Sequence, residues 1–80
     1  MSKLVNYESM TFRQYLEHLG MGVRQFAREV GVDPSIISHY ARGRFSPSAA
    51  TLQKLHQATG LPEGTIIRMV ENSRKERESA

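Results

Sequence analysis

The alternation of apolar and polar side chains along the chain predicts five short helices. Apolar residues recur every three or four positions within five segments, residues 11–20, 22–31, 33–43, 48–60 and 62–72. This spacing places them on one face of a helix, where they can pack against the other helices. The residues expected to face inward are Phe12, Leu16, Leu19, Phe26, Ala27, Val30, Ile37, Tyr40, Ala41, Leu52, Leu55, Ala58, Ile66, Ile67 and Val70. The pattern therefore predicts an all-α fold.

Residues that start and stop helices border these segments. Thr11 stands three residues before Gln14, which is the spacing of a capping box. Asp33 precedes Pro34, a pair suited to an N-cap and the first helical position, and Ser48 opens the fourth segment. The first three segments end at Gly20, Gly31 and Gly43. Only a short turn is then left between the second and third helices.

The two ends of the chain differ from its middle in composition. Residues 73–80 carry mixed charge and almost nothing apolar, so we expect a disordered tail beyond about Asn72. Residues 1–10 form an N-terminal arm, whose apolar residues can pack on the core or on a partner: Leu4, Val5, Tyr7 and Met10. The folded domain is expected to span residues 11–72.

Length and composition exclude several classes of protein. A chain of 80 residues forms one domain, without room for a deep catalytic cleft between domains. There is no cysteine, the first ten residues lack the apolar core of a signal peptide, and no apolar run approaches a membrane span. We expect a soluble, cytoplasmic protein that has no membrane partner.

The positive charge is concentrated in the middle of the chain. The formal net charge is +3, and between Asp33 and Glu63 there is no acidic residue, whereas Arg42, Arg44 and Lys54 lie there. The basic and acidic residues outside this interval balance each other, eight against eight. Such a stretch attracts polyanions, although a solvated face that binds nothing can have the same composition.

The sequence contains no arrangement typical of a catalytic or metal site. His18, His39 and His56 are too far apart for a local metal motif. No serine has a histidine and an aspartate placed for hydrolysis in so small a fold. We therefore expect no enzyme activity, no metal and no cofactor.

The segment VRQFAREVGVDPSIISHYAR resembles the helix-turn-helix of the lambda repressor and Cro-like family, called Xre-type. The resemblance rests on the small Ala27, the turn residue Gly31 and five apolar positions: Phe26, Val30, Val32, Ile37 and Tyr40. ARGRFSPSAATLQKL and TGLPEGTIIRM resemble the segments that follow in the family, so the similarity runs from about residue 11 to 70. It implies a five-helix DNA-binding domain.

Elementary packing explains why one face of the helix in residues 34–42 stays uncovered. Ile37 and Tyr40 hold this helix against the body, and its outward side chains are Ser35, Ile36, Ser38, His39 and Arg42. A polar helix face that projects from a small body fits the DNA major groove.

Different roles at DNA are expected along this helix. Ser35, Ser38 and His39 are placed to hydrogen-bond base edges. Asp33 lies near the bases but serves first as the helix cap, and Ile36 can contact a thymine methyl. The phosphate contacts are expected from Arg24, Gln25, Arg42 and Arg44. Gly22 and Val23 replace the polar pair that anchors the second helix in the family.

Two classes of function fit these observations. The first is a sequence-specific, DNA-binding transcriptional regulator, a small repressor of phage, plasmid or bacterial origin that binds double-stranded DNA at the nucleoid. The second is a protein-interaction adaptor or antitoxin-like module on the same scaffold, because a fold does not settle a function. A homodimer is expected for the first class, through Ile66, Met69 and Val70, with Met69 facing outward.

Overall fold

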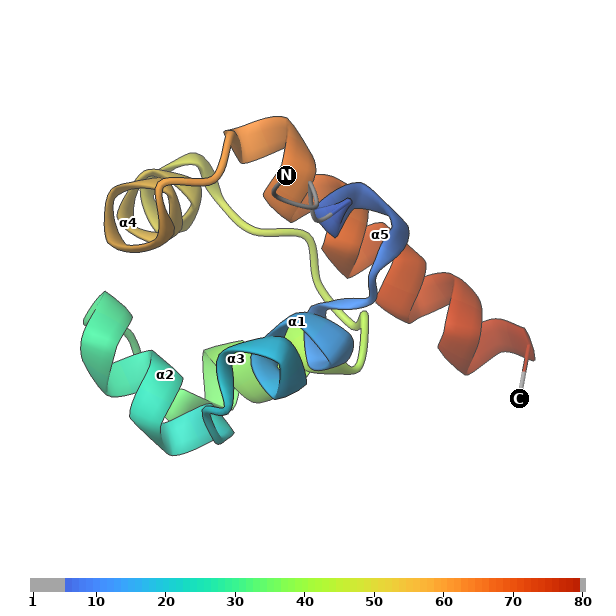
Figure 1. The fold of residues 1–80 in the computed structure, drawn as a ribbon, viewed down its shortest axis with the longest axis horizontal. Coiled ribbons are helices and arrows are strands. Elements are labelled where there is room, and N and C mark those ends of the chain that lie inside the picture. The colour runs from blue at the N-terminus through green and yellow to red at the C-terminus, as the bar shows by residue number, and fades with distance from the viewer. Residues whose placement is uncertain (1–5, 80) are drawn as a thin grey trace, which may run out of the picture.

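The computed structural model describes residues 6–79, which form one short 3-10 helix and five α-helices. In chain order these are η1 (Tyr7–Ser9), α1 (Phe12–Leu19), α2 (Val23–Val30), α3 (Pro34–Ala41), α4 (Ala49–Thr59) and α5 (Glu63–Ser79). The helices α2 and α4 lie at one end, and α5 runs toward the other end of the molecule (Figure 1). No strand occurs within residues 6–79, and the predicted all-α fold of five helices is confirmed.

The predicted caps start three of the helices. Thr11 Oγ1 accepts a hydrogen bond from the Gln14 N–H at 3.0 Å, and Gln14 Oε1 accepts one from the Thr11 N–H at 2.9 Å. This reciprocal pair is the predicted capping box of α1. Asp33 caps α3 and Ser48 caps α4 through their side chains. Each such cap stabilises its helix by about 1 kcal/mol.

The turn between α2 and α3 is as short as the sequence predicts. Gly31 has a left-handed backbone, with φ of 87°. The N–H groups of Gly31 and Val32 both donate to the Ala27 carbonyl, at 2.8 and 3.0 Å. Ala27 is fully buried at the place where the two helices approach. A larger side chain there would separate them.

An aromatic cluster in the core joins the first three helices. The ring of Phe12 packs edge-on against three others, with centroid distances of 5.8 Å to Phe26, 6.1 Å to Tyr40 and 6.2 Å to Tyr15. Aromatic pairs favour this edge-to-face geometry. Burial raises the pKa of Tyr15 and of Tyr40, so both remain neutral phenols. The rest of the buried apolar core comes from Leu16, Ala27, Ile37, Leu52, Leu55, Ile66, Met69 and Val70.

Helix α5 continues to Ser79, so the predicted disordered tail of residues 73–80 is wrong for every residue that the structure describes. Two polar side chains attach this part of the helix to the body. Ser73 Oγ accepts a hydrogen bond from the Phe12 N–H at 2.9 Å, and Asn72 Nδ2 donates to the carbonyls of Glu8 and Met10, both at 2.8 Å. The bond from Ser73 satisfies the Phe12 N–H, which has no partner within α1. The two bonds from Asn72 join α5 to η1 and to Met10, the residue that follows it.

Gly43 allows the loop after α3 to lie directly on α5. Its backbone is left-handed, with φ of 68°, and a Cβ on this residue would overlap the backbone of Ser73 and Arg74. Only a residue without a side chain fits both conditions. The end of α3 and the C-terminal half of α5 are therefore held together.

The expected outward orientation of Met69 is wrong. Met69 is 0% exposed, and its neighbours Ile66 and Val70 are also buried in the core. The buried face of α5 follows Ile66, Met69, Val70 and Ser73, which is the spacing of one helical stripe. The sequence pattern placed Ile66 and Val70 on this face but missed Met69 and the polar Ser73. The three residues predicted to form a dimer surface are thus core residues.

Two residues that were expected to face inward are instead exposed. Leu19, the last residue of α1, is 38% exposed, and Ala58 on α4 is exposed. On α4 the inward face passes through Leu52 and Leu55 to the half-buried Thr59 instead. In the N-terminal arm, Tyr7 and Met10 pack against the core, whereas Leu4 and Val5 lie outside the described residues.

Candidate nucleic-acid interface

The exposed face of α3 is held in place by the buried face of the same helix. Ile37 is fully buried and Tyr40 is 4% exposed. On the other side, Ser35 and Arg42 are exposed and Ser38 is half-buried. These three residues are spaced at intervals of three and four, so they share one face of the helix. The structure thus brings together the polar residues that the sequence predicted to be outward.

The start of α3 carries a fixed hydrogen-bond pattern. Asp33 Oδ1 accepts hydrogen bonds from the Ser35 N–H at 2.8 Å and from the Ser35 hydroxyl at 2.7 Å. The hydroxyl and backbone bonds from Ser35 hold the pKa of the Asp33 carboxyl below its usual range. Because the Ser35 proton is directed at Asp33, the hydroxyl oxygen presents lone pairs to a partner. It is therefore an acceptor in this arrangement.

His39 is half-buried and lies beside the exposed Phe45. The two rings meet edge-on, with a centroid distance of 4.8 Å. The Nδ1 atom of His39 is buried and has no hydrogen-bond partner among the described residues. The ring nitrogen left for a base or a phosphate is therefore Nε2.

Ile36 is less available than the sequence predicts. It was expected to face outward, but it is half-buried and packs against the core. The helix face toward the core is broad at this point because Ile36 and Ile37 both contribute to it. Ile36 presents only part of its surface next to Ser35.

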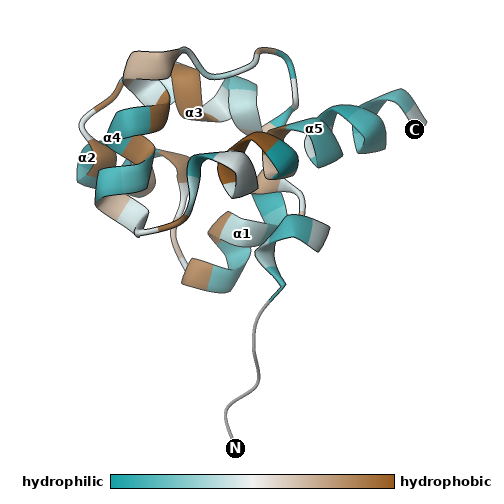
Figure 2. Cartoon of the chain, turned by 90° about the horizontal axis from the view of Figure 1, so that it is seen from above, coloured by the Kyte–Doolittle hydropathy of each residue, from teal (hydrophilic) through white to brown (hydrophobic). Residues whose placement is uncertain are grey.

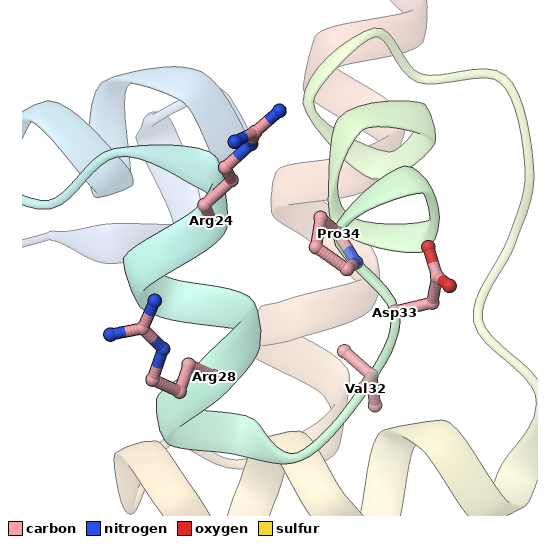
Figure 3. A pocket seen from close by; sticks show the side chains of 5 residues that line it. All are labelled: Arg24, Arg28, Val32, Asp33 and Pro34. Atoms are coloured by element: carbon pink, nitrogen blue, oxygen red, sulfur yellow. The ribbon is translucent and has the colours of Figure 1, made fainter.

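A hollow of about 440 Å³ lies on the surface beside α2 and the turn into α3, and it is lined by Arg24, Arg28, Val32, Asp33 and Pro34. Figure 3 shows Arg24 directed toward the gap between α2 and the start of α3, whereas the guanidinium group of Arg28 lies on the side of α2 away from the turn. Arg24 was predicted as a phosphate ligand, but Arg28 was not. Their separation of four residues, which puts them on one face of the helix, was the signal that could have identified Arg28.

Arg13 on α1 also lies at the α3 face, and it was not predicted from the sequence. A second hollow, of about 350 Å³, is lined by Arg13, Val23, Ser38, Arg42 and two apolar residues. Arg13 belongs to a different helix, and no local pattern indicates that the start of α1 meets the end of α3. The remaining predicted phosphate ligands, Gln25 and Arg44, are both exposed.

Residues 6–79 offer neither a metal site nor a membrane span. No group of three or more histidine, cysteine, aspartate or glutamate side chains there could hold a metal ion. Within the same residues, no helix is both long and apolar enough to cross a membrane.

The short turn, the buried Ala27 and the uncovered face of α3 define a helix-turn-helix DNA-binding protein. A family model described as helix-turn-helix matches residues 12–66, more than half of the chain. The protein belongs to the lambda repressor and Cro-like, Xre-type helix-turn-helix family, which binds DNA and regulates transcription. No curated protein and no solved structure matches the chain.

Proposed function

We propose that this protein is a sequence-specific repressor of phage, plasmid or bacterial origin, which inserts α3 into the major groove of DNA. The observation that carries the proposal is the α3 face itself. Ser35 and Arg42 are exposed and Ser38 is partly exposed, while Ile37 and Tyr40 fix the helix to a packed core. A rigid helix that offers acceptors and donors to solvent matches the pattern of groups on base-pair edges.

Each polar group on this face has a matching group on DNA. The acceptor at Ser35 suits the amino group of cytosine or adenine, and Nε2 of His39 suits N7 of a purine or a phosphate. Arg24, Gln25, Arg42 and Arg44 supply the phosphate contacts that position the helix. A domain bound in this way at a promoter prevents RNA polymerase from binding the same DNA. This is sufficient for repression, which would take place at the nucleoid in the cytoplasm.

A homodimer is part of this proposal. Helix α3 has eight residues and therefore a length of about 12 Å, which spans only a few base pairs. Two copies that bind half-sites about 34–36 Å apart would supply the missing affinity and specificity. The dimer surface is not the set Ile66, Met69 and Val70, because these residues are in the core.

The test is a selection of bound duplexes from a random pool, followed by titration of the enriched site at several salt concentrations. We expect a two-fold symmetric site and an affinity that falls by about 0.9 log units per log unit of salt for each phosphate neutralised. Ser38→Ala should relax the preference at one base pair by about 1–3 kcal/mol. Arg44→Ala should weaken all sequences alike.

Two results would refute the proposal. A salt dependence near zero with no enriched sequence would favour a protein-interaction module on the same scaffold. A monomer in sedimentation at all concentrations, together with a selected site that lacks two-fold symmetry, would refute the homodimer.

A further inference from the structure

The C-terminal part of α5 lies beyond the family match, which ends at residue 66, yet it is attached to the helix-turn-helix. Ser73 binds the start of α1, and Gly43 lies against the backbone of Ser73 and Arg74. Past these contacts the helix projects from the body, as Figures 1 and 2 both show, and Figure 2 colours its end as hydrophilic. The projecting turns carry charged residues next to the end of α3.

Arginines from α1, from the C-cap of α3 and from α5 line one hollow where α5 leaves the body. A hollow of about 350 Å³ is lined by Arg13 of α1, Arg42 at the end of α3 and Arg77 of α5, together with Ala41, Ser73 and Glu76. Three arginines against one glutamate give the residues that line this hollow a formal excess of two positive charges. Guanidinium groups present planar sets of donors that match the oxygens of a phosphate.

This hollow adjoins the face that is proposed to read bases. Arg13 and Arg42 also line the neighbouring hollow that contains Ser38 of the α3 face. A phosphate held between Arg42 and Arg77 would therefore belong to the duplex whose groove α3 enters. Since backbone phosphates line both edges of the groove, an anion site beside the helix end is where one of them would pass.

We propose that Arg13, Arg42 and Arg77 form a binding site for a DNA backbone phosphate that flanks the bases read by α3. This inference rests on the proposed function and extends it, because it makes the projecting end of α5 a part of the DNA interface. The last turns of α5 act as an arm that holds the backbone beside the half-site.

The experiment compares Arg77→Gln with Lys75→Gln in titrations of the selected duplex at several salt concentrations. Both changes remove one positive charge from the exposed end of α5, but Lys75 does not line the hollow. Arg77→Gln should reduce the steepness of the log–log salt dependence by about 0.9 and weaken binding at low salt by about fivefold. Lys75→Gln and the charge-conserving Arg77→Lys should keep the wild-type slope. Because the site contacts no base, the selected sequence should be the same for all four proteins.

Circular dichroism should show equal helical content for all four proteins, since both substituted residues are exposed. Equal slopes for Arg77→Gln and Lys75→Gln would overturn the phosphate site while leaving base reading by α3 intact. Failure of the wild type to bind any duplex would instead refute the proposed function, and the site with it.

Discussion

Ser73→Ala removes the hydroxyl that joins the far part of α5 to the start of α1. In the wild type, Ser73 Oγ accepts a hydrogen bond from the Phe12 N–H at 2.9 Å and donates one to the Met69 carbonyl at 3.1 Å. Ser73 is 3% exposed and Phe12 1%, so water cannot replace the lost acceptor. A buried donor left without a partner costs about 1–3 kcal/mol. The better helix propensity of alanine offsets about 0.5 kcal/mol of this, so the free energy of unfolding should fall by about 0.5–2.5 kcal/mol.

Thermal unfolding followed by circular dichroism measures this loss. In a domain of this size each kcal/mol lowers Tm by about 4–8 °C. The matched control is Ser79→Ala in the same helix, where the hydroxyl donates to the Lys75 carbonyl at 2.8 Å but is exposed. Its effect should stay within about 0.5 kcal/mol. Equal Tm values for the two variants would show that the bond between Ser73 and Phe12 does not hold α5 to the body, and would refute the reasoning.

Two more predictions concern the backbone at Gly43 and the cap of α3. Gly43→Ala should lower the free energy of unfolding by clearly more than Gly60→Ala. Both glycines have a left-handed φ, which costs alanine about 1–2 kcal/mol, but only Gly43 lies against the backbone of Arg74. Equal decreases in the free energy of unfolding, measured by urea denaturation, would argue against the close approach. The lowered pKa of Asp33 means that its ionised form stabilises the fold at neutral pH, and this contribution is lost as the pH falls through the folded-state pKa. Asp33→Asn keeps a good cap but cannot titrate, so the difference between its free energy of unfolding and that of the wild type should shrink in acid. A difference that does not change with pH would contradict the prediction.

The helix starts and the central turn could be predicted because their causes are local. Thr11 and Gln14 are three residues apart, and Asp33 is two residues from Ser35, whose N–H donates a hydrogen bond to the Asp33 carboxylate. Gly31 ends α2 through a bond to the nearby Ala27 carbonyl. A signal confined to one helical turn has the same meaning in any fold, so the sequence suffices to interpret it.

The candidate interface could be predicted in part, for the same reason. Ser35, Ser38 and Arg42 lie on one face of α3 because of helical periodicity alone. Arg13 and Arg77 escaped the prediction because they reach the end of α3 from other helices. Where these helices meet depends on how the core packs.

The sequence by itself determined the helical class, the caps and the polar face of α3, because each depends on residues within one or two turns of each other. The tertiary structure decided where Met69 points and whether α5 continues past Asn72. Ser73 and Phe12 are 61 positions apart, and their hydrogen bond makes a polar residue part of a buried stripe. Such a bond forms only after the helices have packed. Packing buries the Phe12 N–H away from water, and the serine hydroxyl then stabilises the fold by accepting its hydrogen bond.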